Sequence, residues 1–132
     1  MLSLRFLFAA LVSVVLAGAP LAWASVTATP FTQEAFAASQ KDGKPILVEI
    51  TAPWCPVCAK QKPILGELLN EPKFQHVAVY NIDFDSQKDA VRAMGATRQS
   101  TLIVFRGATE LGRSTGDSNP ESIKALVAKT AE

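Results

Sequence analysis

Two cysteines placed directly after an apolar segment narrow the folds open to this chain. Residues 45–51 (PILVEIT) are mostly apolar and rich in β-branched side chains, which is typical of a strand buried inside a sheet. Residues 54–58 (WCPVC) follow at once, and the pattern beyond them predicts a helix over residues 56–70. The sequence therefore places Cys55 and Cys58 at the first turn of a helix that begins where a central strand ends.

This placement indicates redox chemistry. Residues at i and i+3 share one face of a helix, so the two sulfur atoms fall within disulfide distance. Cys55 lies at the helix N-terminus, where free N–H groups and the helix dipole favour an anion, so we expect its pKa to lie below the free-thiol value of about 8.5. Because a thiolate is the attacking species in thiol–disulfide exchange, Cys55 is the candidate nucleophile. We expect Cys58 to be more buried and to act as the resolving thiol.

Composition excludes several other classes of function. The chain of 132 residues has 13 basic and 12 acidic side chains without a run of either sign, which argues against nucleic acid and anionic lipid surfaces as partners. Two cysteines cannot staple a disulfide-rich mini-fold, and alone they cannot fill a four-ligand zinc site. The sequence contains no phosphate loop, Ser-His-Asp set or dinucleotide fingerprint, and we expect no cofactor.

The first 24 residues form a separate unit. Arg5 is their only charged residue, residues 6–19 carry no charge, and an A-x-A sequence ends at Ala24. This pattern predicts a signal peptide over residues 1–24 that is cleaved after Ala24, with an uncleaved membrane anchor as the alternative. Residues 25–132 then form one domain, which we expect to be periplasmic or secreted, monomeric and without a stable membrane span.

The rest of the chain predicts alternating helices and strands. The expected elements are helix 31–40, strand 45–51, helix 56–70, strand 76–82, helix 86–94, strand 101–106, a hairpin partner at 110–114 and a helix from 119. Pro30 suits the first turn of the first helix. This order indicates an α/β fold, with a central mixed sheet and helices on both of its faces.

Glu49 is an acidic residue inside the apolar strand 45–51. Alternation along the strand puts its side chain on the same face as those of Leu47 and Thr51. One interpretation is an edge-strand carboxylate that faces water. The other is a buried carboxylate near the cysteine pair, with a raised pKa, that exchanges a proton with Cys58. The desolvation cost of a buried acid favours the second interpretation, because packing alone does not retain such a residue.

On these residues the chain resembles the thioredoxin family. The resemblance runs from Phe31 to Ala131 and rests on ILVEITAPWCPVC, Pro63, AVYNID, STLIVFRGATELGRSTG and the final helix. It implies a thioredoxin fold with Cys55 as nucleophile, Cys58 as resolving thiol and Glu49 at the position of the family's buried acid. The implied partners are protein thiols or disulfides and an upstream redox protein, with the direction of electron flow left open. The residues expected to contact substrate are Trp54, Pro56, Gln99, Ser100 and Thr101.

The chain departs from the family's pattern at Ser100. Family members carry a cis-proline there, which presents a backbone edge to the substrate and keeps metal away from the thiols. A cis bond before a non-proline residue costs about 2.5–4 kcal/mol, which favours a trans Gln99–Ser100 bond. The Ser100 hydroxyl could also donate a hydrogen bond to the Cys55 sulfur and tune it. The lysine that thioredoxins pair with the buried acid is replaced by Val79, so Glu49 lacks that cationic partner.

Two functions are compatible with these features. The first is an exported thiol:disulfide oxidoreductase that exchanges the Cys55–Cys58 dithiol or disulfide with protein substrates. The alternative is a non-enzymatic thioredoxin-like module, which binds peptides or binds metal or an iron–sulfur cluster as a dimer. In the cluster case, each of two chains supplies Cys55 and Cys58.

Overall fold

The apolar segment Pro45–Thr51 forms β2, the central strand of a five-stranded mixed sheet. The computed structural model describes residues 26–132, so the predicted signal peptide lies outside the described residues. The strand order is β1-β3-β2-β4-β5, with β1 and β2 parallel to β3, and β4 antiparallel to both β2 and β5. This confirms the predicted mixed sheet.

Helices alternate with strands along the chain in the predicted order, apart from a short first strand. The elements are β1 Thr29–Pro30, α1 Gln33–Lys41, β2 Pro45–Thr51, α2 Pro56–Leu69, β3 Ala78–Asp83, α3 Lys88–Ala93, β4 Thr101–Arg106, β5 Thr109–Thr115 and α4 Pro120–Ala128. Two 3-10 turns are added at Pro72–Phe74 and Lys129–Ala131.

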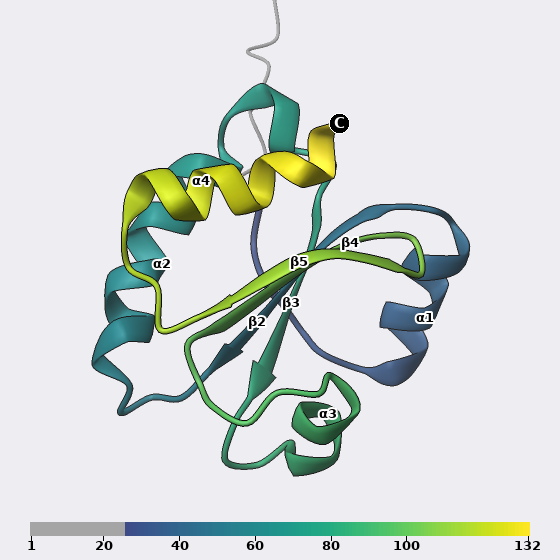
Figure 1. Ribbon diagram of the computed structural model, residues 1–132. Coiled ribbons are helices and arrows are strands. Elements are labelled where there is room, and N and C mark those ends of the chain that lie inside the picture. Colours follow the sequence, from purple (N-terminus) through teal and green to yellow (C-terminus); the bar gives the residue numbers. More distant parts are fainter. Residues whose placement is uncertain (1–25) are drawn as a thin grey trace, which may run out of the picture.

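The sheet separates two apolar layers (Figure 1). Helices α2 and α4 cover one face, where their leucine and isoleucine side chains pack with Leu47, Val79, Leu102 and Val104 of the strands. Helices α1 and α3 cover the other face, where Phe36 and Val91 pack with Ile46, Val48, Ile50 and Ile103. Because β2 is covered on both faces, Ile46, Leu47, Val48 and Ile50 are all fully buried.

The first helix begins later than the sequence predicts, and Pro30 is not part of it. Thr32 caps α1 by accepting a hydrogen bond from the Ala35 N–H at 3.2 Å. Pro30 instead lies in β1, and the next residue, Phe31, donates its N–H to the Asn81 carbonyl at 2.9 Å. Pairing with β3 therefore places Pro30 and Phe31 beside the sheet, although the local sequence predicted that they begin the first helix.

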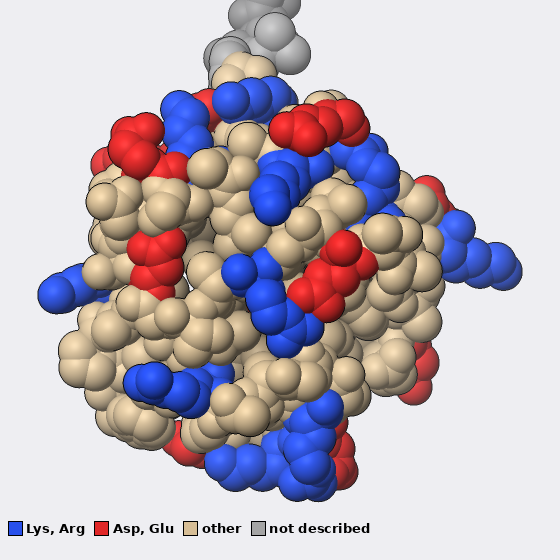
Figure 2. All heavy atoms as spheres, viewed as in Figure 1, with Lys and Arg blue, Asp and Glu red and all other residues tan. Residues whose placement is uncertain are grey.

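Charged side chains of both signs lie interspersed on the surface. On the face drawn in Figure 2, lysine and arginine groups and aspartate and glutamate groups lie scattered among uncharged residues. This pattern agrees with the equal numbers of acidic and basic residues beyond residue 24. Within residues 26–132, no helix has the length and apolar character needed to cross a membrane.

Candidate active site

Cys55 and Cys58 form a disulfide at the point where the chain enters α2. The two Cα atoms are 5.3 Å apart, and Cys55 is the N-cap residue of the helix, with an extended backbone (φ −83°, ψ 111°). Its Sγ accepts a hydrogen bond from the Cys58 N–H at 3.1 Å. Pro56, at the first helical position, has no N–H, so the sulfur takes its donor from one turn along the helix.

Both cysteines are buried, and their order of burial differs from the prediction. Cys55 is 3% exposed and Cys58 is 8% exposed, so Cys58 is not the deeper residue. The pair packs with Ala52, and the half-buried Val57 and Phe84 lie against it. The extent of burial therefore does not distinguish the nucleophile from the resolving thiol. Position on the helix does distinguish them, because the Cys55 sulfur is the N-cap of α2.

Trp54 precedes Cys55 in the chain. It is a large apolar side chain that is exposed to solvent, with 58% of its surface accessible. Its indole Nε1 donates a hydrogen bond to Asp85 Oδ2 at 2.7 Å. Asp85 follows β3, and its own N–H donates to Asp83 Oδ1 at 3.1 Å. The indole is therefore hydrogen-bonded to the turn after β3, which the pairing of β3 with β2 brings next to the cysteine motif.

Glu49 lies on the face of the sheet that α2 covers. Its side chain points to the same face of β2 as that of Leu47, which packs against the leucines of α2. Burial raises the pKa of its carboxyl, while Asn81, its register partner on β3, and the nearby Lys62 ammonium oppose that rise. The carboxyl thus has a cation in reach despite Val79, since Lys62 of α2 acts on it from the helix side.

Ser100 precedes β4 in a conformation that the sequence did not predict. Its φ is 55°, the left-handed region that non-glycine residues avoid, and the described residues contain no cis peptide bond. The pairing of Ile50 with Thr101 places it beside the segment that leads into Cys55. Its hydroxyl donates to the Gln99 carbonyl at 2.6 Å, and not to the Cys55 sulfur as proposed from the sequence.

Comparisons with known proteins agree with this architecture. The family model described as Thioredoxin matches residues 27–129. The chain belongs to the thioredoxin family. It is 32% identical over 98 residues to the thioredoxin of Chlamydia trachomatis, which covers 74% of this chain and 93% of that protein. It is 30% identical over 93 residues to the H-type thioredoxin of Fagopyrum esculentum, covering 70% and 78%.

Solved structures of the family superpose on the same fold. The crystal structure of Trxlp from Edwardsiella tarda matches with a TM-score of 0.72 and 36% sequence identity, over 74% of this chain and 95% of that one. Oxidised thioredoxin O2 of Arabidopsis thaliana matches with a TM-score of 0.69 at 21% identity, over 81% and 96%. With its Cys-X-X-Cys pair, this member of the thioredoxin family is a thiol:disulfide oxidoreductase.

The predicted site residues lie in two parts of the chain, the segment from β2 to the start of α2 and the segment that leads into β4. Cys55, Trp54 and Pro56 lie at the start of α2, and Glu49 lies on the strand before it. Thr101 is buried, and its hydroxyl donates to the Arg98 carbonyl at 2.8 Å. Substrate contact by the five residues named for it stays a prediction. Within residues 26–132, no three His, Cys, Asp or Glu side chains group closely enough to hold a metal ion.

Sequence reasoning missed three residues that contact this site: Gln61, Phe84 and Asp85. Gln61 could have been found from the sequence, because it is a polar residue on the same face of the helix as Cys58 and Leu65, where an apolar side chain is expected. Phe84 and Asp85 could not be found in this way. Phe84 reaches the cysteines, and Asp85 reaches Trp54, only because β3 pairs with β2. In the turn between β3 and α3, Asp83 Oδ1 accepts hydrogen bonds from the Ser86 N–H and hydroxyl.

Proposed function

We propose that the protein is an exported, periplasmic or secreted, thiol:disulfide oxidoreductase that acts on protein thiols or disulfides through Cys55 and Cys58. The observation that supports this best is the Cys55 sulfur at the N-cap of α2, 3.1 Å from the Cys58 N–H. When the disulfide is reduced, this donor and the helix dipole favour a thiolate on Cys55. The attacking species of thiol–disulfide exchange is thereby formed at the entrance to the helix.

In the reducing direction, the reaction proceeds in two exchanges. The Cys55 thiolate attacks one sulfur of a substrate disulfide, a mixed disulfide forms, and the other substrate sulfur leaves as a thiolate that takes up a proton. Cys58 then loses its proton and attacks Cys55, which reforms the Cys55–Cys58 disulfide and releases the second substrate thiol. Two electrons pass to the substrate, and in the oxidising direction every step reverses.

Glu49 is the group we assign to the proton of Cys58. It lies on the face of the sheet under α2, and burial raises the pKa of its carboxyl, so its proton is held nearer to neutral pH. Glu49→Gln is therefore expected to slow the second exchange by at least about tenfold, because the amide neither gives nor accepts this proton. Stopped-flow decay of the mixed disulfide measures it, with Glu67→Gln on the exposed part of α2 as the control. Equal decay rates for Glu49→Gln and parent would contradict the assignment.

The same substitution has a predicted effect on stability that depends on pH. The pKa of Glu49 is raised in the folded protein, so its contribution to stability is fully present below its ordinary pKa of 4.5 and is lost as pH rises through the folded value. Glu49→Gln cannot ionise, so it is expected to be more stable than the parent near pH 8. The two proteins should converge as the pH falls to about 4, where the parent carboxyl is mostly protonated in both states. Urea denaturation at both pH values measures this difference, and a constant difference would contradict the burial of the carboxyl.

Export is supported by the sequence of residues 1–24, with its charged start, apolar run and A-x-A end. Expression of the full chain in a bacterial host is expected to give a periplasmic protein whose N-terminal residue is Ser25. Val14→Arg, which puts a charge into the apolar run, should leave the protein uncleaved in the cytoplasm. Recovery of the intact chain in the membrane fraction would instead indicate a retained anchor.

The non-enzymatic alternative is separated from this proposal by colour and mass. An oxidoreductase of this kind purifies as a colourless monomer that exchanges disulfides. A coloured dimer that contains metal or iron and sulfide, and that lacks exchange activity, would contradict the proposal.

A further inference from the structure

Gln61 is a polar side chain on the apolar, buried face of α2, the helix that carries the cysteines. It is 2% exposed, and it shares the buried side of α2 with Cys58, Leu65 and Leu68. An amide placed there is costly unless its polar atoms are hydrogen-bonded. Its Nε2 donates to two main-chain carbonyls, that of Asp117 at 2.7 Å and that of Ser100 at 3.3 Å.

These two carbonyls belong to loops that are distant from α2 in the sequence. Ser100 ends the loop before β4, and Asp117 lies between β5 and α4. The Ser100 carbonyl also accepts the Gly116 N–H at 2.9 Å, and Gly116 has a φ of 75°. The Gln61 amide therefore joins the helix that carries the cysteines to the residue with φ 55°, a conformation that persists only where the surroundings hold it.

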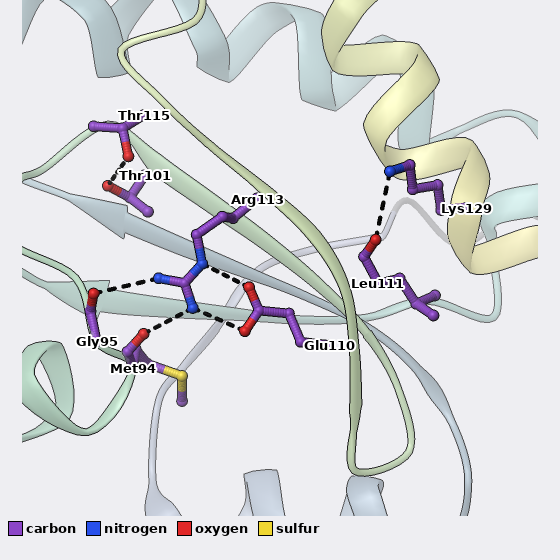
Figure 3. A network of polar contacts seen from close by, with 8 residues as sticks. All are labelled: Met94, Gly95, Thr101, Glu110, Leu111, Arg113, Thr115 and Lys129. Atoms are coloured by element: carbon purple, nitrogen blue, oxygen red, sulfur yellow. Dashed lines mark hydrogen bonds and ion pairs between the residues drawn. The ribbon is translucent and has the colours of Figure 1, made fainter.

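The loop before β4 is fixed at both ends by other contacts (Figure 3). At its start, the Arg113 guanidinium, paired with Glu110, donates to the Met94 carbonyl at 3.0 Å and the Gly95 carbonyl at 3.4 Å. At its end, the hydroxyls of Thr101 and Thr115 are 3.1 Å apart and hydrogen-bonded. The peptide units around Ser100 lie between these two ends, where the Gln61 amide and the Gly116 N–H both bind the Ser100 carbonyl.

We propose that Gln61 is a positioning residue that holds the Gln99–Ser100 backbone in register for docking of an extended protein substrate. This inference rests on the proposed substrate contact of Gln99 and Ser100. Both hydrogen bonds of the Gln61 amide nitrogen go to main-chain carbonyls and not to sulfur. Gln61 thus acts on the affinity for a substrate that pairs with this backbone, and leaves the exchange between sulfur atoms unchanged.

Gln61→Met tests this, because methionine keeps the length of the side chain and removes both donors. The full mature protein is assayed with insulin in the presence of excess dithiothreitol. For 5,5′-dithiobis(2-nitrobenzoate), the protein is reduced first, the dithiothreitol is removed, and a single turnover is followed, because dithiothreitol reduces this disulfide directly. The KM for insulin is expected to rise about tenfold, the effect of losing one or two hydrogen bonds, with kcat within about twofold of the parent. The rate with the small aromatic disulfide, which does not pair with the loop, and the reduction potential should stay at the parent values.

Two further variants keep the result interpretable. Gln61→Glu sets a carboxylate against the two carbonyls and should raise the KM for insulin more than Gln61→Met does. Ser39→Ala removes a buried hydrogen bond to Tyr80 on the other face of the sheet, and it should lower stability without changing the KM for insulin. A shifted reduction potential, an equal loss with both substrates, or an unchanged KM for insulin in Gln61→Met would overturn the inference. A parent protein that reduces neither substrate would overturn the proposed function itself.

Discussion

Cys55→Ser is expected to lower disulfide exchange by at least about 1000-fold, the scale on which loss of a catalytic nucleophile acts. We assign the role of nucleophile to Cys55 on electrostatic grounds. Burial does not support the assignment, because the prediction that Cys58 is the more buried thiol is wrong. The Cys55 sulfur caps α2 and accepts the Cys58 N–H, whereas Cys58 lies inside the first helical turn. Only the thiolate of Cys55 gains the full effect of the helix N-terminus. Initial rates of insulin reduction measure the loss.

Cys58→Ser is the matched variant, and its expected result differs in kind. Attack by Cys55 persists, but the mixed disulfide is no longer resolved, so covalent adducts with a substrate accumulate. Mass spectrometry after mixing with a peptide that contains an intramolecular disulfide detects them as the sum of both masses, because the second peptide sulfur stays attached as a thiol. Adducts formed by Cys55→Ser, with none formed by Cys58→Ser, would show that the roles of the two cysteines are reversed.

The fold could be predicted from the sequence because its strongest signals are local. The segment 45–51 has to be buried on both faces, and the Asn119-Pro120 pair starts α4 as its capping pattern predicts, with Asn119 Oδ1 accepting two N–H groups. The error at Pro30 has the opposite cause. A proline suits both the first turn of a helix and an edge strand, and pairing with β3, about 50 residues later, decides between them.

The site could be predicted only in part, for the same physical reason. The spacing of Cys55 and Cys58 and the lone acid Glu49 are visible in one short segment. The φ of Ser100 is not, because the groups that bind its carbonyl belong to Gln61 and Gly116, on either side of it in the sequence. The packing of Phe84 against the two cysteines is likewise not visible in that segment, because Phe84 follows β3 in a distant part of the chain.

Ser100→Pro restores the residue that the family carries at this position, yet it is expected to lower the free energy of unfolding by about 2–4 kcal/mol. Proline fixes φ near −65°, whereas the backbone of Ser100 has a φ of 55°. The substitution also removes the hydroxyl that donates to the Gln99 carbonyl. The loop cannot accept proline without releasing the Ser100 carbonyl from Gln61 and Gly116. Urea denaturation at neutral pH, on the oxidised protein, measures the change.

Ser100→Gly separates backbone strain from the lost hydroxyl. Glycine adopts a positive φ without a steric penalty, so the strain it relieves offsets the hydrogen bond it loses, and its stability should stay within about 1 kcal/mol of the parent. Reasoning from family consensus predicts the opposite order, with Ser100→Pro the more stable variant. The order of the two variants therefore decides between a loop that simply lost its proline and a loop rebuilt around Ser100. In the rebuilt loop, the hydrogen bonds from Gln61 and Gly116 replace the proline ring as the restraint on the backbone beside Cys55.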